Sequence, residues 1–162
     1  MSLTDINAPL EEVRSYLTAR YDQRFEVHPK LFEEVVASVF RDLGYRARAT
    51  AYTGDDGIDV VMALDDSSDE TTGVQVKRYR DAISVEQLRS LAGALLIGGH
   101  TKGVFITTST FQSGAERTAQ ISKDRGYEIQ LLDAPGFSKA FTSPRSTPIA
   151  RASCSSLGGP SS

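Results

Sequence analysis

The chain has 162 residues, of which 40% are hydrophobic and 24% charged, and its formal net charge is -3. This length predicts one domain with a substantial core, and the small net charge excludes no class of partner, because a local basic face is enough to bind nucleic acid. No apolar run reaches the roughly 18 residues of a membrane helix, the first residues lack a secretory-signal pattern, and the single cysteine, Cys154, fits a reducing compartment. We therefore expect a cytoplasmic protein without a membrane partner.

The first part of the chain predicts two helices. Apolar residues at helical spacing indicate a short amphipathic helix over residues 7–20, followed by an aromatic connector over Tyr21–Pro29. From Lys30 to Leu43 the helical pattern is strong, and Gly44 supplies a helix stop. One continuous apolar stripe of this second helix is formed by Leu31, Phe32, Val35, Val36, Val39, Phe40 and Leu43.

Three strands are expected next, because the pattern changes to alternation over Tyr45–Ala51, Ile58–Leu64 and Val74–Tyr79. The acidic run Asp65–Glu70 predicts a solvated loop between the second strand and the third. One face of the second strand is expected to carry Ile58, Val60, Met62 and Leu64. In the third strand, Val74 and Val76 are expected to point inward, opposite Gln75, Lys77 and Tyr79.

The remaining elements alternate between helix and strand. Ser84, followed three residues later by Gln87, predicts a capping box that opens a helix ending at Gly98–Gly99. A buried strand over 103–108, a helix over 113–125, a strand over 127–132 and a short helix over 135–141 follow.

This order of elements predicts an α/β fold. We expect a mixed central sheet of about five strands, flanked by helices on both faces. The expected division is an N-terminal helix and connector over 1–28 that pack on the core, a main domain over 29–142, and a disordered tail over 143–162 that is rich in Ser and Pro.

The spacing of polar residues on the expected strands points to a chemical site. Side chains two residues apart on a strand share a face, so Gln75 and Lys77 project together, and Asp59 projects beside them from the neighbouring strand. A carboxylate and an amide oxygen are ligands for Mg²⁺, and a lysine can orient water or stabilise a charged phosphate. This combination is typical of metal-dependent cleavage of a phosphodiester, although the same residues also occur on ordinary exposed sheet faces.

A second carboxylate is expected from the preceding helix. With Phe32 placed at 0°, Glu33 lies at about 100°, at the edge of the apolar stripe, whereas Glu34 lies at about 200° and faces water. Glu33 can therefore lean over the sheet and join Asp59.

Several motifs together resemble the Mrr-like restriction endonuclease domain of the PD-(D/E)xK nuclease superfamily, in the variant that has Gln in place of the second acid. In chain order they are Phe32-Glu33, Leu43-Gly44-Tyr45, Gly54-Asp55-Asp56-Gly57-Ile58-Asp59, Gln75-Val76-Lys77 and Gly103-Val104-Phe105-Ile106-Thr107-Thr108-Ser109. The resemblance runs from about Pro29 to about Leu132. This chain has Asp56 where the family commonly has Gly.

The resemblance implies a restriction-endonuclease-like core, with the order α-β-β-β-α-β-α-β, and a type II or type IV restriction-like endodeoxyribonuclease. It implies Asp59, Gln75 and Lys77 as the active-site set, with Glu33 contributing and with Mg²⁺, or Mn²⁺ in its place, held by Asp59, Gln75 and Glu33. DNA, often with methylated bases, is the implied substrate. A homodimer is expected if both DNA strands are cut together.

Several other residues have two possible roles, one functional and one structural. Arg46, Arg48, Arg78 and Arg80 either contact DNA phosphates or are plain surface charges. Asp55 either shapes its turn or assists the metal, and Asp56 shares this second possibility. Thr107, Thr108 and Ser109 either approach the substrate or cap a turn, while His28 and His100 are expected at the surface. The alternative functions are a DNA-binding module of the same fold that does not cut, and a nuclease of repair intermediates or junctions.

Overall fold

The computed structural model describes residues 4–50, 57–65 and 67–142. The predictions for Asp55, Asp56 and the tail over 143–162 lie outside these residues. In chain order the elements are α1 (Leu10–Ala19), the 3₁₀ helix η1 (Tyr21–Glu26), α2 (Pro29–Asp42), β1 (Arg46–Ala49), β2 (Val60–Ala63), β3 (Thr71–Lys77), α3 (Val85–Gly98), β4 (Lys102–Thr107), α4 (Ser113–Asp124), β5 (Glu128–Leu132) and α5 (Ala134–Thr142). None of the described helices is both long and apolar enough to cross a membrane.

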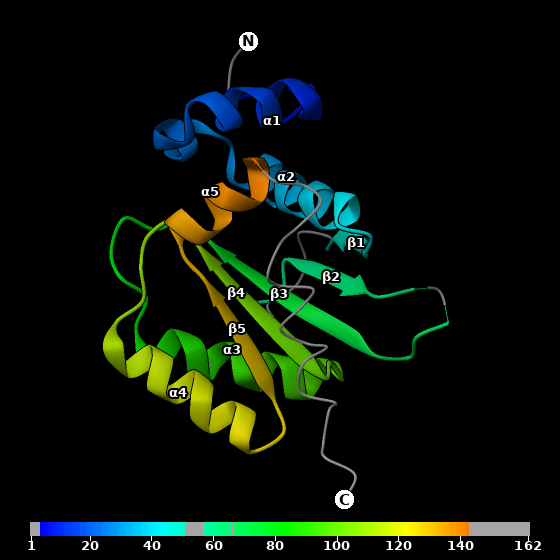
Figure 1. Cartoon of the computed structure of the whole chain (residues 1–162), viewed down its shortest axis with the longest axis vertical. Coiled ribbons are helices and arrows are strands. Elements are labelled where there is room, and N and C mark those ends of the chain that lie inside the picture. The colour runs from blue at the N-terminus through cyan, green and yellow to red at the C-terminus, as the bar shows by residue number, and fades with distance from the viewer. Residues whose placement is uncertain (1–3, 51–56, 66, 143–162) are drawn as a thin grey trace, which may run out of the picture.

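The five strands form one sheet in the order β1-β2-β3-β4-β5. The first three strands pair antiparallel, and β3, β4 and β5 pair parallel. Figure 1 shows that the carboxyl ends of these parallel strands point toward α5 and the N-terminal helices. The predicted mixed sheet and the predicted order of elements are therefore confirmed.

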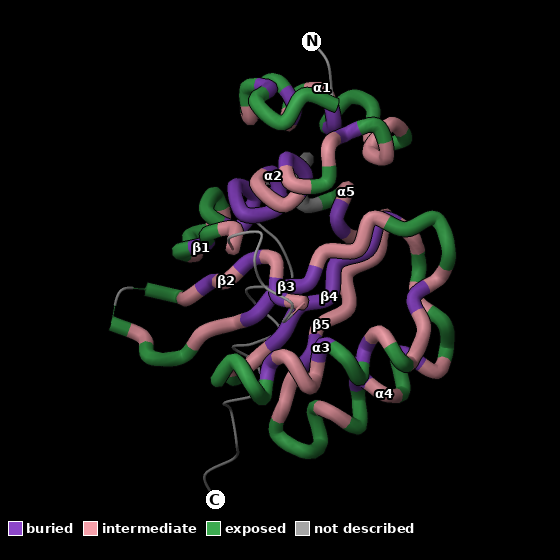
Figure 2. Tube along the Cα trace, turned by 180° about the vertical axis from the view of Figure 1, so that it is seen from behind, coloured by how far each residue is buried: buried purple, intermediate pink, exposed green. Residues whose placement is uncertain are grey.

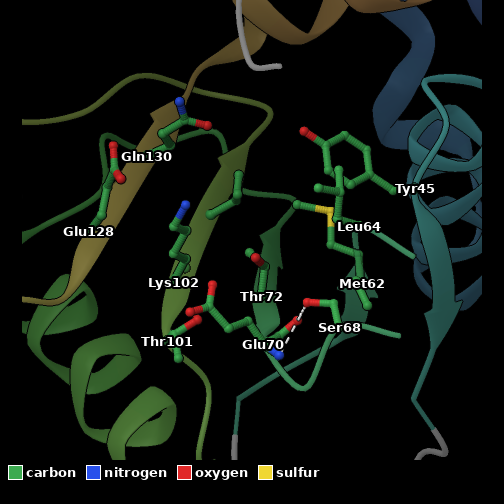
Figure 3. Close-up of a pocket in the computed structure, with 13 residues that line it drawn as sticks. Tyr45, Met62, Leu64, Ser68, Glu70, Thr72, Thr101, Lys102, Glu128 and Gln130 are labelled. Atoms are coloured by element: carbon green, nitrogen blue, oxygen red, sulfur yellow. Dashed lines mark hydrogen bonds between the residues drawn. The ribbon is translucent and has the colours of Figure 1, made fainter. Parts of the chain in front are cut away.

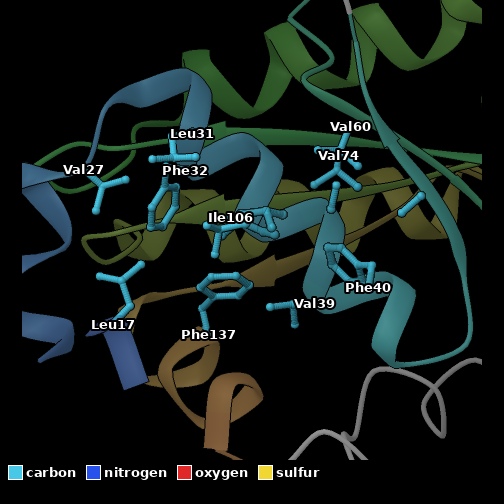
Figure 4. Close-up of a cluster of buried hydrophobic side chains, with 14 of the residues drawn as sticks. Leu17, Val27, Leu31, Phe32, Val39, Phe40, Val60, Val74, Ile106 and Phe137 are labelled. Atoms are coloured by element: carbon cyan, nitrogen blue, oxygen red, sulfur yellow. The ribbon is translucent and has the colours of Figure 1, made fainter. Parts of the chain in front are cut away.

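Helices cover both faces of the sheet, and each face has its own apolar cluster. On one face, α2 and α5 pack on the sheet and α1 packs on these two helices (Figure 1). The cluster that joins them includes Leu17, Phe32, Phe40, Val74, Ile106 and Phe137 (Figure 4). On the other face, α3 and α4 contribute Leu88, Leu91, Leu95, Ala115 and Ala119, which pack with Phe105 and Ile129. Figure 2 shows buried residues concentrated in α2 and the central strands, whereas the outer side of α1 is exposed.

The sequence at the ends of α2 explains where this helix begins and ends. Pro29 occupies the first turn, where its missing N–H costs nothing, and His28 caps the helix because its Nδ1 accepts a hydrogen bond from the Lys30 N–H (3.2 Å). Gly44 follows the helix with φ +96°, a conformation that favours glycine. His28, which was expected at the surface, is half-buried and has this capping role.

Several element boundaries differ from the predictions, among them the ends of β2, which is shorter than expected (Val60–Ala63), and of β3, which ends at Lys77. Residues 21–26 of the expected connector form the 3₁₀ helix η1. Strand β3 begins at Thr71, three residues earlier than expected, because Thr71, Thr72 and Gly73 pair with β2 on one side. Thr72 and Gly73 also pair with β4 on the other side. The β-branched threonines suit this strand, whereas the glycine had obscured the alternation.

A local irregularity at the start of β2 moves Ile58 to an unexpected face. The Asp59 N–H donates to the Val74 carbonyl (2.8 Å), while Val60 is also the register partner of Val74. Two consecutive residues thus face one, which is the arrangement of a β-bulge. Val60 packs in the cluster under α2, but Ile58 packs in the cluster under α3. The prediction that Ile58 and Val60 share a face is therefore wrong.

Candidate active site

Asp59 lies directly before β2 and is held from two sides. Its Oδ2 accepts a hydrogen bond from the Val76 N–H of β3 at 2.7 Å. Its backbone carbonyl accepts from the Thr50 N–H, just beyond β1, at 2.9 Å, and its own N–H donates to Val74. The carboxylate is therefore fixed between two neighbouring segments of the sheet rather than carried on a free loop.

The surroundings of Asp59 are electrostatically unusual. The pKa of this carboxyl is raised to about 6, mainly by burial and to a smaller extent by the carboxylate of Glu33. The hydrogen bond from Val76 and the ammonium groups of Lys77 and Lys30 act in the opposite direction. One further carboxylate and two lysines thus influence the pKa of Asp59, and a divalent cation would favour its ionised form.

Glu33 reaches this position from α2. Its Oε2 lies 2.9 Å from Nζ of Lys30, which also donates to the Thr50 carbonyl at 2.5 Å, and the Glu33 side chain is 20% exposed. The helical phase predicted that Glu33 leans toward the sheet and that Glu34 faces water. In the structure the Glu33 carboxylate raises the pKa of Asp59, in agreement with the first prediction. Glu34 is half-buried rather than fully exposed.

Gln75 approaches from the opposite face of the sheet. Its register partner Phe105 belongs to the cluster under α3, and Gln75 is only 6% exposed. Gly57 adopts φ +72°, and a Cβ atom added there would lie 3.1 Å from Nε2 of Gln75. The motif therefore requires glycine at position 57 both for its backbone conformation and for the close approach of the amide.

The amide oxygen of Gln75 has no partner in the described part of the chain. Oε1 is buried and has no hydrogen bond to any described residue. A buried acceptor in this state costs free energy, so it marks a place where another group is expected to bind.

Lys77 ends β3 two residues beyond Gln75, and it is half-buried. Its ammonium group lowers the pKa of Asp59 and lies 5.6 Å from the centroid of the Tyr79 ring. The structure thus brings Asp59, Glu33 and Lys77 into one electrostatic group, while Gln75 contacts the turn at Gly57 that leads into Asp59.

The donor set fits a hard divalent cation. Magnesium prefers carboxylates, neutral oxygens and water, and Asp59, Glu33 and the orphaned Oε1 of Gln75 are of these kinds. Within residues 4–50, 57–65 and 67–142, no three His, Cys, Asp or Glu side chains form a metal-binding group. The third ligand predicted from the sequence is the amide of Gln75, whose oxygen is neutral.

The four arginines named from the sequence differ in their surroundings. Arg46 and Arg48 are exposed on β1, next to Ala63 and Val61 of β2. Arg78 is half-buried and donates to the backbone carbonyls of Phe25 and Val27. Arg80 is exposed, and its guanidinium carbon lies 4.2 Å from the centroid of the Phe25 ring.

The hydroxyl groups after β4 have structural partners. Thr107 Oγ1 accepts from the Ser109 N–H (3.1 Å), and Thr108 Oγ1 donates to the Tyr79 carbonyl (2.9 Å). These bonds match the turn-capping reading of the three residues. His100 is half-buried at the surface, with Nδ1 2.8 Å from Oγ1 of Thr71.

Sequence reasoning missed Lys30, which joins the group around Asp59. A signal was present, because Lys30 and Glu33 stand three residues apart on one helix, a spacing at which opposite charges pair. The ring of Phe25 was also missed, since only the fold brings it under Arg80.

A separate hollow lies where β4 and β5 begin, at the other end of the parallel strands from Lys77. Figure 3 shows Tyr45, Met62, Thr72, Lys102, Glu128 and Gln130 around it. None of the candidate site residues lines this hollow. It therefore plays no part in the chemistry considered for Asp59.

Comparison with known proteins identifies the family. A restriction endonuclease family model, Mrr_cat, matches residues 25–141. The chain is 35% identical over 121 residues to the type IV methyl-directed restriction enzyme EcoKMrr of Escherichia coli (strain K12), covering 71% of this chain and 40% of that enzyme. The chain thus spans less than half the length of this relative.

Solved structures support the same fold. The DNA modification-dependent restriction endonuclease AspBHI matches with a TM-score of 0.60 at 21% identity, over 87% of this chain and 38% of that one. The MspJI restriction endonuclease, solved in complex with a 27-mer oligonucleotide, matches with a TM-score of 0.52 at 25% identity, over 84% of this chain and 31% of that one. Metal dependence is general among such nucleases. The match over residues 25–141 confirms the resemblance found in the sequence, and the chain belongs to the Mrr_cat restriction endonuclease family.

Proposed function

We propose that this chain is a metal-dependent DNA endonuclease that hydrolyses phosphodiester bonds. The observation that carries the proposal is the grouping of Asp59 with Glu33 and Lys77, which lies inside the span matched by the restriction endonuclease family. A carboxylate pair beside a lysine suits phosphodiester cleavage, because the reaction needs a cation site and positive charge near the phosphate.

The proposed cofactor is Mg²⁺, for which Mn²⁺ can substitute, and its proposed ligands are Asp59, Glu33 and Gln75. When bound, a divalent metal withdraws charge from the phosphate and makes water a better nucleophile. The unpartnered Oε1 of Gln75 supports its place among the ligands. A single amide in place of an acid lowers the negative charge of the site, so the second carboxylate from α2 is needed.

The chain's own residues would then divide the remaining work. The Val76 N–H keeps the Asp59 carboxylate in one orientation. The Lys77 ammonium group, at the end of β3, would orient the attacking water and stabilise the negative charge that builds up on the phosphate oxygens.

We further propose that the substrate is foreign or modified DNA. This rests on the relative EcoKMrr, which is described as methyl-directed, and on AspBHI, which is described as modification-dependent. A cytoplasmic location agrees with the single cysteine. Cutting both strands together calls for two sites, so we propose a homodimer on DNA, which light scattering of the protein with and without a DNA duplex can test.

Cleavage of plasmid DNA tests the proposed activity. Asp59→Asn and Lys77→Ala should each abolish cleavage in Mg²⁺ while keeping the fold, and a chelator should abolish cleavage by the parent. Arg117→Ala, an exposed change on α4, is the control and should cut normally. Equal cleavage by the parent and both site variants would overturn the assignment.

The same assay separates the alternative functions. DNA binding in chelator, with no nicking in either Mg²⁺ or Mn²⁺, would identify a binding module that does not cut. A panel of methylated, unmethylated and branched DNA distinguishes restriction from cleavage of junctions, because a junction nuclease would prefer the branched substrate.

A further inference from the structure

Two arginines contact aromatic rings of η1 close to the segment that follows Lys77. The guanidinium carbon of Arg80 lies 4.2 Å from the centroid of the Phe25 ring, and that of Arg24 lies 4.6 Å from the same centroid. Arg24 also lies 4.8 Å from the centroid of Tyr21. The 3₁₀ helix η1 thus brings an aromatic ring into contact with the end of the strand that carries the candidate site.

Two of the nearby arginines use their donors inside the protein. Arg24 donates through Nε (3.1 Å) and Nη2 (2.9 Å) to the Thr108 carbonyl, and through Nη1 (3.0 Å) to the Tyr21 carbonyl. Arg78 donates through Nη1 to the carbonyls of Phe25 and Val27. Both side chains therefore hold η1 against the ends of β3 and β4.

Arg80 is different. It is exposed, and among the described residues its guanidinium makes no hydrogen bond or ion pair, only the contact with Phe25. The five N–H donors of a guanidinium lie in its plane, so a ring against its face leaves the donors at its edge available. Such an edge matches the two oxygens of a phosphate.

The backbone that carries Arg80 is also fixed. Ser109 Oγ donates to the Arg80 carbonyl at 3.0 Å, and Thr108 Oγ1 donates to the Tyr79 carbonyl at 2.9 Å. With its backbone tied to the loop after β4 and its side chain resting on Phe25, Arg80 loses less conformational freedom on binding than a free surface arginine would.

We propose that Arg80, oriented by Phe25, binds a DNA backbone phosphate a short distance along the strand from the phosphate that is cleaved. The inference rests on the proposed nuclease function. Lys77 and Arg80 are three positions apart, so their Cα atoms are separated by at most about 10 Å. A DNA strand presents one phosphate per about 3.4 Å of helix axis, so the contacted phosphate lies within about three nucleotides of the one near Lys77.

DNA binding in a chelator tests this contact apart from cleavage. The full chain carrying Asp59→Asn serves as the reference, with a short labelled DNA duplex titrated at several salt concentrations. Adding Arg80→Ala should weaken binding about fivefold for every duplex sequence and lower the slope of log K against log salt by about 1. Adding Arg117→Ala removes an equal charge from α4 and should leave both quantities unchanged.

The orienting role of Phe25 has its own signature. Phe25→Leu should weaken binding while keeping the salt slope, because the charge remains, and this effect should disappear when Arg80 is already alanine. Arg80→Lys should keep the slope but bind less tightly than the reference, since lysine lacks the planar fork. Thermal unfolding of each variant checks that the fold is retained.

The outcomes separate this inference from the proposed function. If the reference binds DNA and Arg80→Ala behaves like Arg117→Ala, the phosphate contact is wrong while the nuclease assignment stands. An additive effect of Phe25→Leu on Arg80→Ala would overturn the orienting role of the ring. Failure of the reference to bind any duplex would overturn the contact, and plasmid cleavage by the parent then decides the nuclease function separately.

Discussion

Lys30 lies between Glu33 and the end of β1, with its Nζ 2.9 Å from Oε2 of Glu33 and 2.5 Å from the Thr50 carbonyl. Both partners of the ion pair are about one-fifth exposed. The ammonium group therefore neutralises a carboxylate at the place where we propose a metal to bind, and the metal must compete with it for Glu33.

Lys30→Met should expose this competition. We expect the metal-free protein to lose about 1 kcal/mol of stability, because a poorly solvated carboxylate loses its partner, and Mg²⁺ to stabilise the variant at lower concentration than the parent. Thermal unfolding across a Mg²⁺ titration measures both effects. Lys123→Met, which breaks a more exposed and longer pair with Glu128 (3.5 Å), is the matched control and should change neither by much. Weaker Mg²⁺ binding by Lys30→Met would contradict the competition.

Asp59→Asn should change how stability depends on pH in a chelator. The carboxyl titrates near 3.8 when unfolded and near 6 when folded, so between these values the folded protein holds a proton that the unfolded chain has lost. The parent therefore loses stability as pH rises from about 4 to about 6, and the asparagine variant lacks this loss.

At pH 7 the asparagine variant should be the more stable protein, by less than about 3 kcal/mol. Denaturant unfolding of both proteins at pH 4, 5, 6 and 7 is the measurement, about one point per pH unit across the window. A difference between parent and variant that is the same at every pH would contradict the raised pKa of Asp59.

Gly57→Ala should impair the site beyond its cost in stability. The alanine must adopt φ +72° and its Cβ would lie 3.1 Å from the Gln75 amide, so we expect a loss of about 1–2 kcal/mol together with reduced cleavage. Gly44→Ala is the control, because φ is +96° there and nothing lies within 4 Å of the added Cβ. It should cost similar stability without reducing cleavage, and an equal loss of activity in both variants would show that strain alone is responsible.

Gln75→Met should separate stability from function. The change removes a buried oxygen that has no partner among the described residues and keeps the length of the side chain. We expect the metal-free protein to keep or gain stability, by up to about 1 kcal/mol, while Mg²⁺-dependent cleavage is lost. Thermal unfolding and plasmid cleavage give the two readouts, and full cleavage by this variant would remove Gln75 from the proposed ligand set.

Much of the fold was predictable because apolar residues recur along the sequence at regular helical or strand spacing. The stripe on α2 favours a helix and the short contiguous apolar run of β4 favours a buried strand, and the order of the elements implies the mixed sheet. The irregular places were not predictable. The bulge at Asp59 and Val60 moves Ile58 to the other face, and nothing in an alternating pattern marks where one extra residue enters a strand.

The candidate site was predictable in part for a similar reason. Glu33, Asp59, Gln75 and Lys77 stand at positions that periodicity and family resemblance both single out. Lys30 and Phe25 depend on how separate elements pack together, and the different surroundings of Arg78 and Arg80 depend on where η1 lies. Local sequence therefore identifies the residues of the site better than it identifies their neighbours.

The hydrogen bond from the Val76 N–H to Oδ2 of Asp59 makes one amide proton of the central sheet a reporter of the candidate site. Any change in the charge on this carboxylate, through protonation or through a cation, alters the strength of that bond. The nuclear magnetic resonance signal of the Val76 amide should therefore shift on titration with acid or Mg²⁺, and binding can be followed in the intact protein without DNA and without catalysis.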